Sequence, residues 1–148
     1  MNVEKARKLL LLGVVTLAVA AMAACSFSVS TAHISSLKVT KEKDGTNETN
    51  SFGPHESIFA QGEVANVPSK VTVKWRLITE KVEGQPANAA VPGMDKSFEL
   101  PADGTSSYHL SPSEAGWPPG KYKIEFSMLN ENGEQKDQKI APFTVSGG

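Results

Sequence analysis

Residues 70–80 read KVTVKWRLITE, and the alternation in this stretch decides the predicted fold. Every second residue is apolar and falls on one side of an extended chain: Val71, Val73, Trp75 and Leu77. Because β-branched residues are frequent and the period is two, the stretch is predicted to be a strand with one buried face. We expect Trp75 to lie between two sheets, near Val73, Tyr122 or Phe126.

The same alternation recurs on both sides of this stretch, without a long helical pattern after residue 25. Asp103-Gly104 predicts the reversal of a hairpin between residues 97–100 and 106–110. Pro142 predicts that the last strand lies at a sheet edge or contains a bulge. Seven short strands predict an all-β fold, a sandwich of antiparallel sheets. The predicted strands are residues 35–41, 57–65, 70–80, 97–100, 106–110, 121–129 and 134–145.

The C-terminal part of the chain resembles the last two strands of bacterial immunoglobulin-like or fibronectin-III-like domains. The resemblance rests on residues 116–122, which read GWPPGKY, and on Asn132-Gly133, Phe143 and Val145. Trp75 is similar to the core tryptophan of that architecture, and Tyr122 to its corner tyrosine. The resemblance implies an immunoglobulin-like antiparallel β-sandwich of about seven strands over residues 34–146, without the cysteine pair of antibody-type domains. It names no molecular role, because this architecture carries many.

Residues 1–24 have the pattern of a helical secretory signal peptide, with a basic start and an apolar stretch over residues 9–21. Cys25, the only cysteine, follows Ala23-Ala24, with Met22 where leucine is preferred; this arrangement resembles the lipobox of bacterial lipoproteins. The resemblance implies cleavage before Cys25 and acylation of its thiol, so that acyl chains hold the protein on a membrane. The alternative is an ordinary cleaved signal that leaves Cys25 as a free thiol. The Ser- and Thr-rich residues 25–33 are predicted to be a tether.

Charge and cysteine content exclude several classes of protein. The chain has 148 residues and a formal net charge of −1; residues 1–24 contribute +2, so the remainder carries −3. A mildly acidic domain is a poor nucleic-acid binder, and the chain has no polybasic segment to hold anionic lipid. A single cysteine allows no intramolecular disulfide, so we expect stability to come from packing alone.

The sequence does not predict an active site, a metal site or a cofactor. His33, His55 and His109 lack the spacing of metal ligands. No Gly-x-Ser-x-Gly turn is present. Aspartate and glutamate fall in loops and on solvated strand faces, where carboxylates make poor general acids. We therefore expect a protein that is not an enzyme.

Two sets of residues are candidates for contact with a partner. One is a row of cations expected on the outer face of two neighbouring strands: Lys74, Arg76, Lys121 and Lys123. We expect Glu125 to pair with one of them. Such a row is either a docking face for an acidic partner or a solvated face that keeps a sheet soluble. The other candidate is Trp117, either an exposed loop contact for a ligand or a cap on the open end of the sandwich.

Together these features predict an exported, lipid-anchored envelope protein that acts as a non-catalytic binding or assembly module for an envelope protein partner. The alternative is an envelope inhibitor or chaperone-like factor that acts on an enzyme or exported client through its loops. Residues 83–95, with Pro86 and Pro92, are the candidate loop. Ser26 stands where an aspartate would resemble an inner-membrane retention signal, which favours the outer membrane in a host with two membranes.

Overall fold

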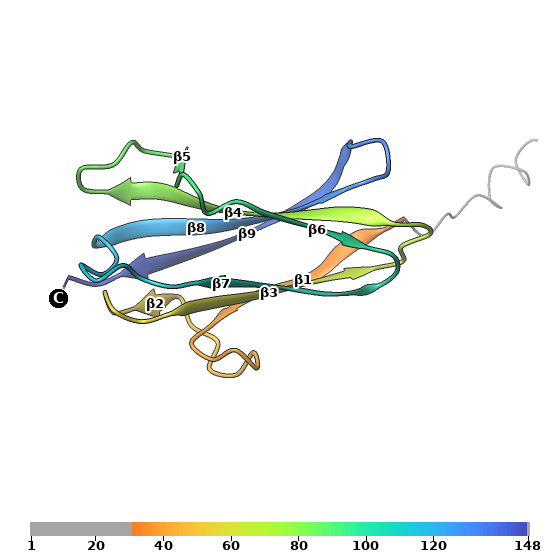
Figure 1. The fold of residues 1–148 in the computed structure, drawn as a ribbon. Helices are drawn as coiled ribbons and strands as arrows, with labels where there is room; N and C mark the ends of the chain where they lie inside the picture. Colours follow the sequence, from red (N-terminus) through yellow and green to blue (C-terminus); the bar gives the residue numbers. More distant parts are fainter. Residues whose placement is uncertain (1–30, 148) are drawn as a thin grey trace, which may run out of the picture. The chain divides into compact units, whose positions relative to one another are not determined.

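The computed structural model describes residues 31–147, and all of the regular structure in this range is β (Figure 1). The predicted signal peptide, Cys25 and most of the predicted tether lie outside the described residues. Within residues 31–147 no helix is long and apolar enough to cross a membrane. The strands are β1 (His33–Thr40), β2 (Ser51–Phe52), β3 (Ile58–Ala65), β4 (Val71–Val82), β5 (Ala89–Ala90), β6 (Lys96–Leu100), β7 (Gly104–Leu110), β8 (Gly120–Leu129) and β9 (Gln135–Val145).

The strands form two sheets that lie in two layers (Figure 1). One sheet has three strands in the order β1-β3-β7; the other has six, in the order β2-β9-β8-β4-β5, with β6 also paired to β4. Every pairing is antiparallel except that of β2 with β9, which is parallel. The all-β prediction is confirmed. The structure has nine strands rather than about seven because two short ones, β2 and β5, add to the edges of the larger sheet.

The predicted hairpin between residues 97–100 and 106–110 is wrong. β6 pairs with β4, whereas β7 pairs with β3 in the other sheet, so the chain crosses between the sheets at residues 101–103. Asp103-Gly104 lies where the chain changes sheets and not between two paired strands. As a result Phe98 on β6 has no partner on β7 across a hairpin, and it is 44% exposed.

The core is centred on Trp75, which is fully buried as predicted. Its ring lies 4.1 Å from that of Phe126 and 5.2 Å from that of Tyr108, measured between centroids. β3 passes close beneath, because Gly62 has no side chain: a Cβ atom there would lie 2.3 Å from the Phe126 ring. Tyr122, at the start of β8, donates from its hydroxyl to the carbonyl of Pro118 at 2.6 Å and so fixes the turn that leads into the strand.

Candidate binding face

The outer face of the six-stranded sheet carries the predicted row of cations. β4 and β8 are hydrogen-bonded neighbours, with Lys74 opposite Ser127, Arg76 opposite Glu125 and Ile78 opposite Lys123. Residues that oppose each other across a ladder share a face, and the alternating residues Trp75, Leu77 and Ile124 are buried on the inner face. The outer face therefore presents four cations: Lys74, Arg76, Lys121 and Lys123.

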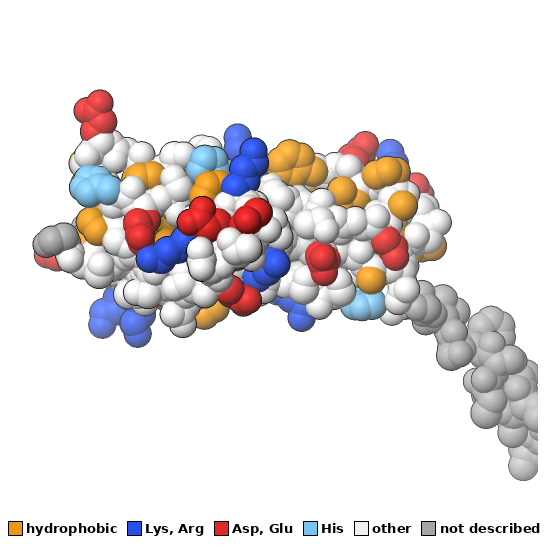
Figure 2. Space-filling model, turned by 90° about the horizontal axis from the view of Figure 1, so that it is seen from below, with side chains coloured by type: hydrophobic (Ala, Val, Ile, Leu, Met, Phe, Trp, Pro, Cys, Tyr) orange, Lys and Arg blue, Asp and Glu red, His pale blue; other side chains and the backbone are white. Residues whose placement is uncertain are grey.

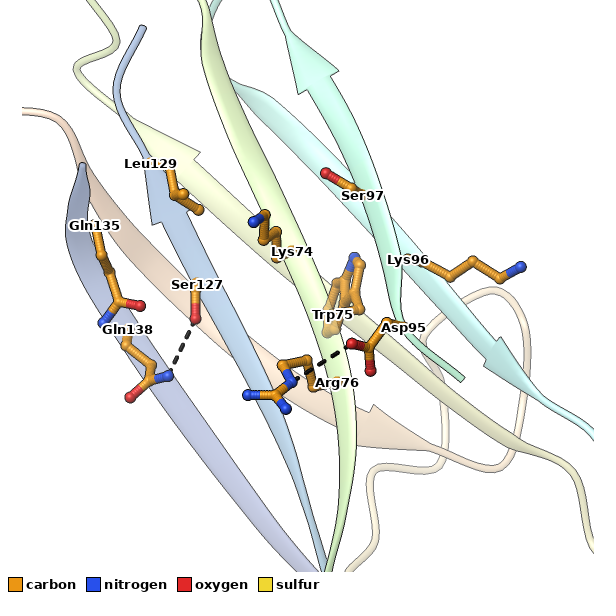
Figure 3. A pocket seen from close by; sticks show the side chains of 10 residues that line it. All are labelled: Lys74, Trp75, Arg76, Asp95, Lys96, Ser97, Ser127, Leu129, Gln135 and Gln138. Atoms are coloured by element: carbon orange, nitrogen blue, oxygen red, sulfur yellow. Dashed lines mark hydrogen bonds and ion pairs between the residues drawn. The ribbon is translucent and has the colours of Figure 1, made fainter. Parts of the chain in front are cut away.

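A shallow groove of about 470 Å³ lies on this face, around the ends of Lys74 and Arg76 (Figure 3). Asp95 and Lys96 border it on one side, and Gln138 on the other. Figure 3 shows Lys74 and Arg76 projecting from β4 into the groove, while Lys96 points away from it. Gln138 donates from Nε2 to the Ser127 hydroxyl at 3.1 Å, which holds the polar wall formed by β8 and β9 in place. The groove is lined by Lys74, Trp75, Arg76, Asp95, Lys96, Ser97, Ser127, Leu129, Gln135 and Gln138.

The expected ion pair of Glu125 does not form. Among the described residues Arg76 pairs instead with Asp95, with 3.6 Å between Nε and Oδ2. The long arginine side chain reaches past its cross-strand neighbour because the chain before β6 returns along the other edge of β4 and brings Asp95 within range. Both side chains are about half exposed, so the pair contributes little to stability. Lys74 has no ion-pair partner within 4.0 Å in residues 31–147, and its charge faces the groove.

The row of cations is not one continuous site. A register shift in β4 between Thr79 and Lys81 places Lys121 opposite Lys81, beyond the groove. Lys121 borders a separate hollow with Glu80. The structure therefore gathers Lys74 and Arg76 at the groove and leaves Lys121 and Lys123 on the same face outside it. The alternation of the sequence revealed the cations, but Asp95 and Gln138 were missed because their place depends on tertiary pairing.

Trp117 is buried, with 8% of its surface exposed. Its indole nitrogen donates to the carbonyl of Glu56 at 3.0 Å, and its backbone amide donates to the carbonyl of Pro54 at 2.7 Å. Gly116, at a φ of 82°, allows the close approach to Pro54 that these bonds require. Trp117 therefore caps the core and is not an exposed loop contact.

Several titratable groups of residues 31–147 have a pKa that their surroundings shift. Hydrogen bonds from neighbouring backbone or side-chain groups lower the pKa of Glu56 and Asp103, which keeps both ionised. Burial raises the pKa of Tyr108 and of Tyr122, and each hydroxyl donates to a backbone carbonyl. No three His, Cys, Asp or Glu side chains in this range lie close enough to hold a metal ion together. His109 stacks on Phe59 with 4.4 Å between ring centroids.

The segment of residues 83–95 is tied to β4. The Thr79 hydroxyl bonds to the carbonyl of Pro86 at 2.8 Å, and the amide of Val91 donates to the carbonyl of Leu77 at 2.9 Å. Together with the pairing of β5 with Ile78 and Thr79, these bonds hold the segment at one end of the larger sheet (Figure 1). The composition of the segment predicts a loop with an edge strand near Val82 or Val91; Val82 ends β4, and β5 ends one residue before Val91.

No protein-family model and no curated protein sequence matches this chain. Among solved structures, an alkylpurine DNA glycosylase of Pseudomonas fluorescens, AlkC, matches 81% of this chain and 32% of its own, with 18% identity and a TM-score of 0.50. The soluble domain of PmoD from Methylocystis sp. matches over 81% and 94% of the two chains, with 15% identity and a TM-score of 0.45. A Niemann-Pick type C2 protein of the Japanese carpenter ant matches over 81% and 96%, with 14% identity and a TM-score of 0.43. At such identities a match concerns the fold alone.

Proposed function

We propose that this protein is an exported, lipid-anchored envelope module that binds an acidic segment of a protein partner without catalysis. The observation that carries the proposal is the groove at Lys74 and Arg76, where one cation has no ion-pair partner within residues 31–147 and the other pairs only with an exposed carboxylate. Four cations on one sheet face exceed what cross-strand pairing needs, since such pairs contribute only about 0.2–1 kcal/mol each. A carboxylate-rich segment is the ligand that this charge pattern favours.

We infer further that the domain is an immunoglobulin-like sandwich of the fibronectin-III type. The partition into β1-β3-β7 and β6-β4-β8-β9 supports this inference. So do the buried tryptophan on β4 and the hydroxyl of Tyr122, which bonds back to Pro118 as a corner tyrosine does. In such sandwiches function lies in surface faces and loops rather than in the core.

The lipid anchor is proposed from the sequence around Cys25. Two or three acyl chains on one residue give stable attachment, because each buried methylene adds about 0.8 kcal/mol and a single chain binds only marginally. With Ser26 at the next position, the outer membrane is the proposed location in a host with two membranes. In this proposal the anchor sets the location, and the groove selects the partner.

The test measures binding of a synthetic peptide of alternating Glu and Ser to the full chain by fluorescence anisotropy. In one variant the four cations of the face are replaced: Lys74→Gln, Arg76→Gln, Lys121→Gln and Lys123→Gln. A matched control makes the same change of charge elsewhere: Lys38→Gln, Lys43→Gln, Lys136→Gln and Lys139→Gln. We expect the first set to weaken binding by about tenfold and the control to have a smaller effect, at about 50 mM salt. Equal effects of the two sets would contradict a site on this face.

A narrower pair of variants locates the site within the face. Lys74→Gln with Arg76→Gln removes the cations of the groove, whereas Lys121→Gln with Lys123→Gln removes those outside it. We expect most of the loss of binding from the first pair. A chemical cross-link between Lys74 and a partner in intact envelopes, absent in the Lys74→Gln variant, would then allow the partner to be identified.

A second candidate function rests on residues 83–95. An inhibitory loop must hold its shape before it meets an enzyme, and the bonds from Thr79 and Leu77 hold this segment against β4. The proposal here is an envelope inhibitor or chaperone-like factor that presents this segment. Replacing residues 83–88 with a Gly-Ser linker tests it: partner capture that is lost here and kept in the variants of the cationic face would favour the loop.

A further inference from the structure

The outer edge of β7 is the least protected sheet edge in the described part of the chain. β1 carries a register shift between Ile34 and Ser36, β2 and β5 have two residues each, and β6 has five residues with charges at Lys96 and Glu99. β9 is free on one side over residues 135–143, but this part carries three charged residues and Pro142. β7 has seven residues, a regular register with β3, and no proline or charged residue. Charges, prolines, bulges and shortness are the devices that keep sheet edges from pairing, and β7 has none of them.

Part of the backbone N–H and C=O groups of β7 have no partner strand. β7 pairs only with β3, so alternate residues direct their N–H and C=O groups away from the sheet. Among the backbone hydrogen bonds of residues 31–147 outside the strand ladders, none involves residues 104–110. The side chains that flank the edge on the outside are uncharged and exposed: Thr105, Ser107 and His109.

The opposite sheet extends past this edge. Phe98 on β6 lies opposite Val73 of β4, so it faces the core side of its sheet, yet it is 44% exposed because the three-stranded sheet ends at β7. A hollow of about 250 Å³ lies between Phe98 and Leu100 of β6 and residues 105–107 of β7. A fourth strand beside β7 would cover Phe98 and close this hollow.

The outer surface of the three-stranded sheet offers a second hollow next to β7. It has a volume of about 290 Å³, lies at the stacked rings of Phe59 and His109, and has Lys43 as the one Lys or Arg in its lining. Figure 2 views the molecule from this side and shows acidic and basic side chains interspersed rather than gathered in one patch. Charge therefore does not select the occupant of this edge. Backbone pairing and apolar contacts do.

We propose that the edge of β7 is a strand-addition site that takes an extended, uncharged segment of another polypeptide. Main-chain hydrogen bonds to residues 104–110 supply affinity, and apolar side chains on one face of the segment pack on Phe98. Side chains on the other face lie beside Ser107 and His109. This site is separate from the cationic groove, so each can fail without the other.

The overhang of β6 disfavours a second copy of the chain as the occupant. The inward side chains of β7, among them Tyr108 at 3% exposure, are already packed in their own core. If two copies paired through β7, the β6 strand of each copy would lie beneath the β7 strand of the other copy. The second sheet of that other copy already fills this space, so the two copies would clash. An extended segment has no sheet beneath it, and both of its faces are free to fill the two hollows.

The probe is an uncharged nine-residue peptide, acetylated and amidated, in which threonine alternates with valine and phenylalanine and a serine stands at each end. Its binding to the full chain is measured by anisotropy, and the bound region by amide hydrogen exchange. We expect slower exchange in residues 104–110 and not in the groove. The same peptide with N-methyl groups on alternate amides keeps its side chains but loses donors, and we expect it to bind about tenfold more weakly.

Two pairs of variants separate the edge from the rest of the surface. Thr105→Lys with Ser107→Lys places charges on the edge, and Asn132→Lys with Gly147→Lys places the same charges away from it, on the hairpin between β8 and β9 and after β9. Phe98→Ser removes the apolar contact, and Ile140→Ser removes the other large exposed hydrophobic residue of the described range, which is 49% exposed. We expect the first member of each pair to weaken peptide binding by about tenfold and the second to leave it unchanged.

Three results would overturn the proposal. One is no binding of the peptide up to about 1 mM. Another is binding that is insensitive to N-methylation or that protects residues other than 104–110. The third is a dimer in sedimentation analysis that Thr105→Lys with Ser107→Lys dissociates, which would assign the edge to a second copy of this chain. Thermal unfolding of every variant shows whether a lost signal reflects a lost fold.

Discussion

The indole nitrogen of Trp75 donates a hydrogen bond to the hydroxyl of Ser106 at 2.8 Å. Trp75 lies on β4 in the larger sheet and Ser106 on β7 in the smaller one, so this bond joins the two layers at the centre of the core. Both side chains are buried, at 0% and 6% exposure. A domain without an intramolecular disulfide thus carries a directional link between its sheets, which fixes how they sit against each other.

Replacing Ser106→Ala leaves the indole N–H of Trp75 buried without an acceptor. We expect the free energy of unfolding to fall by about 1–3 kcal/mol, the cost of one buried unsatisfied donor. Urea denaturation followed by tryptophan fluorescence measures the change. Ser107→Ala, at the exposed neighbouring position, is the control. If both variants lose the same small amount, the bond does not contribute to stability.

Gly62→Ala brings a Cβ atom to 2.3 Å from the Phe126 ring, a contact that forces β3 or the ring to move. We expect a loss of about 1–3 kcal/mol in the free energy of unfolding, the range for overpacked cores. Gly104→Ala is the control, since its nearest neighbour would lie at 3.9 Å. Adding Phe126→Leu to Gly62→Ala makes room and recovers part of the loss if the contact with the ring is the cause.

Cys25→Ser tests the proposed anchor. We expect the variant to appear in the soluble fraction or to stay as an uncleaved precursor, whereas the wild type sediments with membranes, because the acylated thiol is the attachment. Intact mass of the purified wild type gives the second measurement and should show cleavage before Cys25 with added acyl chains. An unmodified amino terminus in the mature protein would exclude the lipobox interpretation.

Glu56 links the connection after β1 to the connection after β2 and gives stability a dependence on pH. Its carboxylate accepts from the amide of Gly53 at 2.6 Å and from Lys41 at 2.9 Å, and these bonds hold its pKa below the ordinary 4.5. A pKa that is lower in the folded state stabilises the fold above the unfolded value, and this gain disappears as the pH falls through the folded value.

We therefore expect Glu56→Gln to be less stable than wild type at pH 7, by a small amount because the carboxylate is 41% exposed. The difference should shrink as the pH falls below 4.5. Urea midpoints measured at a series of pH values test this expectation. Glu114→Gln, an exposed glutamate in the segment before β8, controls for loss of a carboxylate in general. A constant difference between Glu56→Gln and wild type at all pH values would contradict the assignment.

The strand pattern of the sequence predicted the inner and outer faces well because side-chain alternation is a local property. The stretch around Trp75 shows this best: its apolar residues are buried and its cations are outside. The partners of short strands are not local. The residues Asp103-Gly104 predict where the chain reverses, but they do not predict which strand pairs with β6. β6 pairs with β4 rather than with β7 because of the backbone edge that is free in the assembled sandwich.

On the candidate binding face, too, the local pattern was predictable and the contacts between distant residues were not. Alternation placed Lys74 and Arg76 on one face, and the neighbouring strand added Lys121 and Lys123. The partner of Arg76 could not be read from the sequence, because Asp95 arrives through the return of residues 83–95 along β4. For Trp117 the sequence left two possibilities open, an exposed loop contact and a cap on the sandwich, and the acceptors on residues 54–56 decide for the cap.

The parallel pairing of β2 with β9 also sets an order on folding. Thr144 donates from its amide to the carbonyl of Asn50, and the amide of Ser146, 94 residues after Phe52, donates to the carbonyl of Phe52. A chain that emerges from the ribosome amino terminus first cannot complete the larger sheet until residues 135–145 have been made. Such distant contacts slow folding. Until the strand of residues 135–145 arrives, β2 has no strand to pair with and β8 keeps one edge unpaired.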